Sequence, residues 1–378
     1  MKIAILANNT PSFIKPMATG LQNMLSHLSV QSEIFDNGLA MLNYSYINNV
    51  SINCKNFVKS GLNILSPKTY YQHQKVTLQL VKQFEAQLNG YDAIIVVCNI
   101  PDAFLKQKLH RIEQIRQQQN NVPIILYQNY YLATRGNWSN SIIKAGGFGL
   151  ERYDWYLAAS ISSIYPLSKE EHPYSVIGHD LRDDILIPKT GEKFKVLLDF
   201  KRKGFEKYRA LQIQALEESN IAFTELSGRY SQNEIKKIYQ EHSALFLSFK
   251  ESFGLPIVEN QLCGNYIFTP FSGWVASHYL NKQVNQGGEG QLGDNFIVYN
   301  NNLEELKDSL LDCKKKYNAV KNYQQFKLQY SAFYQGDLIV LKKCLDKLRC
   351  GEIHSNSHIK YLRLNKDIVN DKNCKLNY

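Results

Sequence analysis

The chain has 378 residues, of which 44% are hydrophobic and 21% are charged, a size and composition that favour two globular domains with an ample core. No apolar run approaches the ~20 residues that span a bilayer, and the seven cysteines are too scattered for a disulfide framework or a metal site. The net charge of +10 comes without a nucleic-acid-binding motif. We therefore expect a cytoplasmic protein with no nucleic-acid partner, and the basic charge leaves peripheral association with the inner face of a membrane open.

Strand-like and helix-like patterns alternate along the chain, which favours an α/β architecture with mainly parallel sheets. In the first half we predict strands over 3–6, 90–98, 122–127 and 153–159. The helices predicted between them cover 15–28, 71–88 and 104–119. A stretch with His-Pro and Ile-Pro dipeptides and little periodicity then predicts a linker over 166–192.

The alternation starts again after the linker. Strands are predicted over 194–199, 221–226, 244–249, 266–269 and 296–299. Helices are predicted over 206–219, 232–240, 256–263, 303–317 and 323–348. Gly264 is expected to end one of these helices in the left-handed conformation. The polar and basic residues 351–378 predict a frayed tail.

Two glutamates, Glu251 and Glu259, frame the junction between a predicted strand and a predicted helix. The helix is expected to begin at Pro256, with Glu259 in its first turn, because proline is well tolerated at the first helical position. A helix start offers unpaired N–H groups and the positive end of the helix dipole, which suits a phosphate. Two lone glutamates at this spacing are more often a solvated strand end and a first-turn carboxylate. The flanking strands and the intervening Ser-Phe-Gly-Leu-Pro make a binding site the better interpretation here.

This segment resembles the donor-binding signature of retaining glycosyltransferases of the family-4 type. That family has the GT-B fold, so the resemblance implies two Rossmann-like domains that face a central cleft. It also implies that Glu251 is the catalytic residue, in contact with the transferred sugar, and that Glu259 binds the ribose hydroxyls. The residues of the loop between them would also bind the donor: Ser252, Phe253, Gly254 and Leu255. The main-chain N–H groups of Gly254 and Leu255 would hold the diphosphate.

Members of the resembled family carry a Gly-Arg pair after the first strand of the second domain and a Lys-Gly pair shortly afterwards, and these basic residues neutralise the diphosphate. Here the stretch reads Asp199-Phe-Lys-Arg-Lys-Gly204, so the Lys-Gly pair matches and the Gly-Arg pair does not. The charge can come from Lys201, Arg202 or Lys203, because ligands bind at such strand ends. The choice among the three stays open, and a solvated basic turn is the alternative interpretation.

A second loop, Ser-Gly-Arg-Tyr at 227–230, follows the next predicted strand. In the resembled family a loop at this place meets the nucleotide base. Gly228 and Arg229 are therefore expected at the donor site, where Arg229 or Tyr230 can stack on the base. We expect no metal, because the chain has no Asp-x-Asp triplet, and no cofactor besides the nucleotide-diphosphate sugar that serves as donor.

The resemblance also implies a domain plan. Residues 1–165 would form an acceptor-side Rossmann-like domain, and the linker 166–192 would lead to a donor domain over 193–322. In GT-B enzymes a terminal helix commonly returns to the first domain, which makes 323–350 the candidate for that helix. The tail 351–378 completes the plan.

The resulting hypothesis is transfer of a hexose-type sugar from a nucleotide-diphosphate sugar to a glycan or lipid-linked acceptor. The transfer would retain the anomeric configuration, need no metal, and serve surface polysaccharide or glycoconjugate synthesis. One alternative is a non-catalytic relative that binds sugar nucleotides or glycans, for which the missing Gly-Arg pair is the main argument. Another is a sugar-nucleotide epimerase of the same fold, which would need acid–base carboxylates or histidines in both domains.

Overall fold

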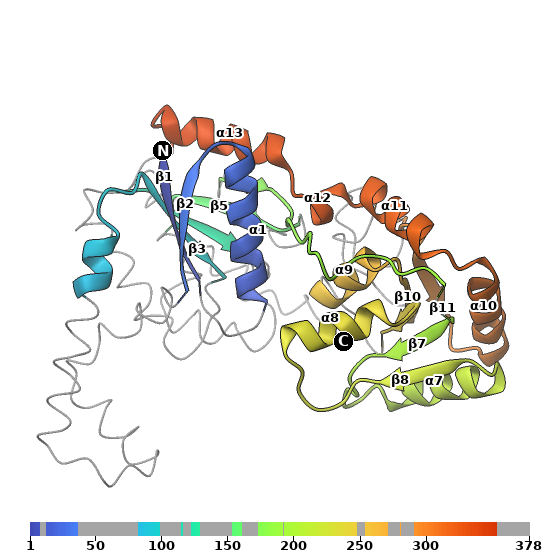
Figure 1. Cartoon of the computed structure of the whole chain (residues 1–378). Coiled ribbons are helices and arrows are strands. Elements are labelled where there is room, and N and C mark those ends of the chain that lie inside the picture. The colour runs from blue at the N-terminus through green and yellow to red at the C-terminus, as the bar shows by residue number, and fades with distance from the viewer. Residues whose placement is uncertain are drawn as a thin grey trace, which may run out of the picture. The chain divides into compact units, whose positions relative to one another are not determined.

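The computed structural model describes residues 1–7, 13–36, 82–98, 115, 122–128, 153–160, 173–191, 193–247, 254–270, 280 and 291–353. The chain forms two compact units (Figure 1). The first is built from Met1–Ala159, Ser163–Ile177 and Leu338–Lys375, and the second is mainly Gly178–Asp337. Within the described ranges, no helix is long and apolar enough to cross a membrane.

A six-stranded parallel sheet forms the centre of the first unit, in the order β2-β1-β3-β4-β5-β6. Its strands are β1 (Lys2–Leu6), β2 (Gln31–Phe35), β3 (Ala93–Val97), β4 (Ile124–Gln128), β5 (Trp155–Ala158) and β6 (Tyr174–Val176). β3 and β4 are buried along their whole length, as is usual for interior strands of a parallel sheet. An amphipathic helix, α1 (Ile14–His27), packs on β1, β2 and β3, and α13 (Leu338–Arg349) packs beside β6.

The second unit contains a five-stranded parallel sheet in the order β11-β10-β9-β7-β8. Its strands are β7 (Lys195–Leu198), β8 (Ala222–Glu225), β9 (Ala244–Phe246), β10 (Tyr266–Pro270) and β11 (Phe296–Tyr299). Its helices are α7 (Glu206–Glu218), α8 (Gln232–Gln240), α9 (Leu255–Leu262), α10 (Leu303–Lys316), α11 (Ala319–Gln329) and α12 (Ser331–Tyr334). Helices α7 and α10 cover one face of this sheet, and α8 and α9 cover the other (Figure 1).

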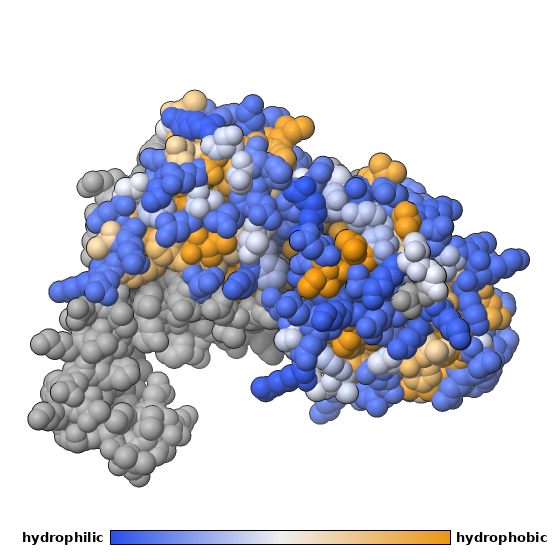
Figure 2. All heavy atoms as spheres, in the orientation of Figure 1, coloured by the Kyte–Doolittle hydropathy of each residue, from blue (hydrophilic) through white to orange (hydrophobic). Residues whose placement is uncertain are grey.

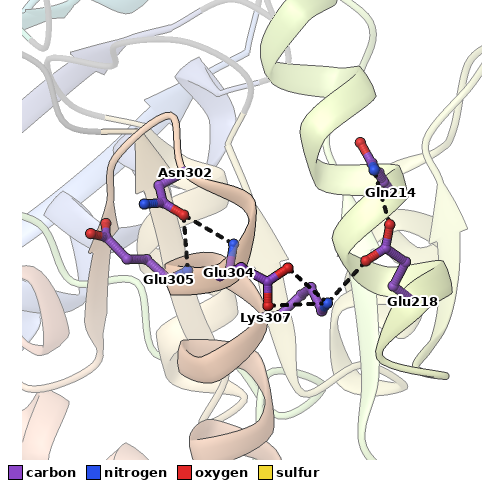
Figure 3. Close-up of polar contacts among 6 residues, drawn as sticks. All are labelled: Gln214, Glu218, Asn302, Glu304, Glu305 and Lys307. Atoms are coloured by element: carbon purple, nitrogen blue, oxygen red, sulfur yellow. Dashed lines mark hydrogen bonds and ion pairs between the residues drawn. The ribbon is translucent and has the colours of Figure 1, made fainter.

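The core under α7 and α10 is built around Phe246 and Phe268, whose ring centroids are 4.6 Å apart. At the surface, the ammonium of Lys307 in α10 lies 2.9 Å from the carboxylate of Glu218 in α7 (Figure 3). The side chain of Asn302 caps α10 by accepting two main-chain N–H groups of its first turn. Hydrophilic side chains predominate on the face of this unit that is seen in Figure 2, with small groups of hydrophobic residues between them.

Both sheets have the same strand order when the strands are counted along the chain. The second strand is outermost, followed by the first, third, fourth and fifth, which is the flavodoxin-like variant of a doubly wound sheet. In such sheets ligands bind beyond the carboxyl ends of the first and third strands, where the direction of winding reverses. This switch point lies between β7 and β9 in the second unit and between β1 and β3 in the first.

The predicted α/β class with two Rossmann-like halves is confirmed by these two parallel sheets. Most predicted strands and helices among the described residues agree with the observed ones within a few residues. The edge strands β2 and β6 were not predicted. β2 is only partly buried, and β6 has three residues and falls inside the segment 166–192, so neither shows the apolar run of an interior strand.

The structure also tests the helix predicted over 323–348 and the left-handed cap predicted at Gly264. The single helix predicted over 323–348 is divided into α11, α12 and α13, because Tyr330 leaves the helical conformation and Gly336 has a φ of +72°. Gly264 has a φ of +81°, as predicted for a left-handed cap. Three predicted segments lie wholly or mostly outside the described residues: 71–88, 104–119 and 351–378.

Candidate functional site

The start of α9 follows β9, one of the two strands at the switch point, and carries no side-chain cap. Gly254 is its N-cap residue, with an extended backbone at φ −140° and ψ 131°. The helix begins at Leu255, one residue earlier than predicted, so Pro256 is its second residue and Glu259 lies in its second turn rather than its first. Main-chain N–H groups and the positive end of the helix dipole therefore meet here, which suits an anion.

Glu259 is buried, with 9% of its surface exposed. Burial raises its pKa to about 7, while the ammonium of Lys236 acts against this shift and the carboxylate of Asp183 adds to it. Lys236 itself forms an ion pair with Asp183. No described residue donates a hydrogen bond to the carboxylate of Glu259. A buried carboxylate without a protein donor can accept hydrogen bonds from the hydroxyl groups of a ligand.

The loop after β7 carries three exposed cations, Lys201, Arg202 and Lys203. The ammonium of Lys201 lies 3.4 Å from the carboxylate of Glu225 at the end of β8. Asp199 begins this loop. Burial raises the pKa of its carboxyl group, while the main-chain N–H of Phe200 and the charges of Arg202 and Arg209 act against this shift. Three cations are thus kept in solvent at one strand end, and one of them is paired with the neighbouring strand.

The loop after β8 packs against the loop after β7. The rings of Phe200 and Tyr230 have their centroids 6.2 Å apart, and the main-chain N–H of Ser227 donates to the hydroxyl of Tyr230 at 3.2 Å. Gly228 has a φ of +77°, and Arg229 beside it is exposed. The two loops that were predicted to meet the donor are therefore joined through an aromatic pair that the sequence did not indicate.

Two buried polar residues of α7 were not predicted. Arg209 donates to the main-chain carbonyl of Asp199, and Gln212 donates to that of Leu247 at 2.9 Å. The sequence indicated an ordinary helix here, in which polar side chains are usually assigned to solvent. The signal that could have found them is their spacing, because Arg209 and Gln212 fall on the same helical stripe as the buried Leu216.

Glu251, Ser252 and Phe253 lie outside the described residues, so their contacts stay predictions. The other predicted donor-site residues follow the carboxyl ends of β7, β8 and β9: Lys201, Arg202, Lys203, Gly228, Arg229, Gly254, Leu255 and Glu259. In the part of the chain that the structure describes, no group of three or more His, Cys, Asp or Glu side chains could hold a metal ion.

No protein-family model and no curated protein matches the chain. Among solved structures, UDP-GlcNAc 2-epimerase from Neisseria meningitidis bound to UDP-GlcNAc matches with a TM-score of 0.52 and 10% identity, over 92% of this chain and 100% of the other. HepE from Anabaena in complex with UDP matches with a TM-score of 0.50 and 13% identity, over 93% of this chain and 100% of the other. The chain has the GT-B fold. Many functions share one fold, so function has to be argued from the site itself.

Proposed function

We propose that the protein is a glycosyltransferase that binds a nucleotide-diphosphate sugar on its second unit. The observation that carries this proposal is the placement of an uncapped helix start at Gly254 and a basic loop at 201–203 after the two strands of one switch point. Both features attract the negative charge of a diphosphate. The buried Glu259 lies in the second turn of the same helix, where it would accept hydrogen bonds from the ribose hydroxyls.

The remaining roles in this proposal follow the resemblance to family-4 enzymes. Glu251 contacts the transferred sugar, and Gly228 and Arg229 meet the nucleotide base. The basic loop and the start of α9 stabilise the negative charge of the departing nucleoside diphosphate, so the protein's own charges assist the leaving group. A glycan or lipid-linked acceptor attacks the face from which the diphosphate leaves, and the anomeric configuration is retained. We place the reaction in surface polysaccharide or glycoconjugate synthesis.

A sugar-nucleotide epimerase is the second candidate, because the chain shares its fold with the Neisseria enzyme. Such an enzyme would bind the same kind of donor but would invert one carbon of the sugar, which requires acid–base groups at that carbon. A non-catalytic relative would bind the sugar nucleotide and leave it unchanged. The three candidates therefore differ in their products rather than in their ligand.

The deciding experiment separates these products. The purified protein is incubated with UDP-glucose, UDP-GlcNAc, GDP-mannose and ADP-glucose, with and without oligosaccharides or polyprenyl-diphosphate-linked saccharides. Acceptor-dependent release of nucleoside diphosphate, with a product of retained configuration by NMR, supports the transferase. An epimeric sugar nucleotide without such release identifies the epimerase, and binding without turnover identifies the non-catalytic relative. A protein that neither binds nor turns over any of these sugar nucleotides would contradict all three candidates.

A further inference from the structure

Helix α7 holds the ends of two strands by means of buried polar side chains. Arg209 donates to the carbonyl of Asp199, the residue directly after β7. Gln212, three residues along the helix, donates to the carbonyl of Leu247, the residue directly after β9. β7 and β9 are the pair that defines the switch point of this sheet. One face of one helix therefore contacts the main chain where both loops of the candidate site begin.

The contacts of Gln212 are specific as well as buried. Its side chain is 0% exposed, and its Nε2 atom donates both to Leu247 and to the hydroxyl of Tyr299, at 2.9 Å and 2.8 Å. A primary amide nitrogen has two hydrogens, so this donor group is fully used. An apolar residue of similar size would fill the same space but would release the carbonyl of Leu247. The polar contact fixes where the chain leaves β9.

Arg209 brings a positive charge under the loop at which the Gly-Arg pair of the resembled family is missing. It is 7% exposed, and burial lowers its pKa while the carboxylates of Glu225 and Asp199 act against this. Its Nε and Nη1 atoms have no hydrogen-bond partner among the described residues. A buried cation of this kind costs stability, and well-packed apolar residues often replace buried charges without loss. Its presence beside Asp199 is explained if the loop needs both the charge and the contact.

We propose that Arg209 and Gln212 are positioning residues of the diphosphate subsite, an inference that rests on the proposed function. Arg209 sets the start of the loop that carries Lys201–Lys203 and adds its charge beneath that loop. Gln212 sets the end of β9, the other strand of the switch point, through the carbonyl of Leu247. Both residues act through the main chain at the strand ends, and Arg209 acts through its charge as well, so they affect the binding of the phosphates more than that of the base or the ribose.

The test compares nucleotides that differ by one phosphate. Affinities of UDP and UMP, GDP and GMP, and ADP and AMP are measured by calorimetry for the wild type, Arg209→Met, Gln212→Leu and a control, Asn265→Leu. Asn265 is a matched control because it is 0% exposed and its amide nitrogen also donates to a main-chain carbonyl, that of Tyr239, at 2.8 Å. It directly precedes β10, so it lies at the amino-terminal ends of the strands, opposite the carboxyl ends at which the candidate site lies.

For the pair of nucleotides that the wild type prefers, we expect the diphosphate to lose at least tenfold in affinity in both α7 variants. The affinity for the monophosphate should change less than threefold, so the ratio of diphosphate to monophosphate affinity falls. In Asn265→Leu the melting temperature should fall and the ratio should stay at the wild-type value. Arg209→Gln, which removes the charge, and Gln212→Met are milder variants for the case that the first two do not fold, and a fall in the ratio is expected for them as well.

The outcomes separate the inference from the proposed function. If the folded α7 variants keep the wild-type ratio of diphosphate to monophosphate affinity, the inference is overturned and the proposed function stands. The same holds if this ratio falls equally in Asn265→Leu. If the wild type binds diphosphates but transfers no sugar, the transferase reaction is wrong and the ratio still decides the inference. If the wild type binds none of the six nucleotides, both are overturned.

Discussion

The ammonium of Lys201 lies 3.4 Å from the carboxylate of Glu225, so a cation of the loop after β7 is joined to the end of β8. This contact places one of the three basic side chains beside a carboxylate. It also means that part of the charge of Lys201 is already balanced. The three cations of the loop are therefore unequal, although the sequence presents them as neighbours of one kind.

The three basic side chains are expected to contribute unequally to the binding of a diphosphate. Lys203→Ala should weaken the binding of a nucleoside diphosphate by about tenfold, the effect of losing one charge-assisted hydrogen bond. Lys201→Ala should cost less, because Glu225 already offsets that charge, and Glu225→Gln should tighten binding by releasing Lys201. Calorimetric titration at low and high salt measures both effects. A larger loss of affinity in Lys201→Ala than in Lys203→Ala would contradict the smaller contribution expected of Lys201.

The second prediction concerns the pH dependence of stability. The carboxyl group of Glu259 ionises near pH 4.5 in the unfolded chain and has a pKa of about 7 in the folded one. Between these values the folded state holds the extra proton, so the free energy of unfolding should fall as the pH rises through this window, by about 3 kcal/mol at most.

Glu259→Gln should remove this part of the pH dependence, because the amide does not ionise. Urea unfolding of both proteins at pH 5, 6, 7 and 8 measures the slope. The variant should also bind nucleoside diphosphates more weakly, since its amide accepts hydroxyl hydrogen bonds less strongly than a carboxylate does. Identical slopes for the two proteins would show that Glu259 is not a buried, proton-binding carboxyl.

The third prediction compares two glycines that both have positive φ. A Cβ atom at Gly264 would lie 2.1 Å from the carbonyl oxygen of Ala319, whereas one at Gly228 would meet nothing within 4 Å. Gly228→Ala should therefore cost only the left-handed conformation, about 1–2 kcal/mol. Gly264→Ala should cost clearly more, because backbone must move. Thermal unfolding of the two variants decides this, and equal losses would contradict it.

The fourth prediction concerns the cap of α10, far in sequence from the site. Asn302 accepts the N–H groups of Glu304 and Glu305 at 3.0 Å and 3.3 Å (Figure 3). Asn302→Ala should lower the free energy of unfolding by about 1 kcal/mol, and Asn302→Asp should keep the cap. Nucleotide affinity should stay the same in both variants. A change in affinity would show that the site depends on general stability rather than on local contacts.

The sequence predicted most of the second sheet because each of its interior strands is a short apolar run between turn residues. It could not predict β6, a three-residue edge strand of which every residue is only partly buried. It placed Glu259 in a first helical turn because it took Pro256 as the first helical residue, and the helix begins at Leu255. Helix ends vary by one residue without any change in hydrophobic pattern, so such differences cannot be resolved from the pattern alone.

The polar contacts behind the site were beyond the sequence for a different reason. Arg209 and Gln212 are buried polar side chains in a helix, and their place on the same stripe as the buried Leu216 is the only local feature that distinguishes them from exposed ones. Their partners, Asp199 and Leu247, are 10 and 35 residues away along the chain. Such contacts are visible only when the strand order is known, because the order decides which strand ends lie beneath the helix.

The most direct test of the account is the rate of nucleoside diphosphate release by the wild type and by Glu251→Gln, with the sugar nucleotide and acceptor that the wild type uses best. We expect acceptor-dependent release by the wild type. In Glu251→Gln we expect a rate at least about a hundredfold lower, the scale of losing a group that acts in the transition state, with little change in nucleoside diphosphate affinity. Release by Glu251→Gln at the wild-type rate would contradict the assignment of the site.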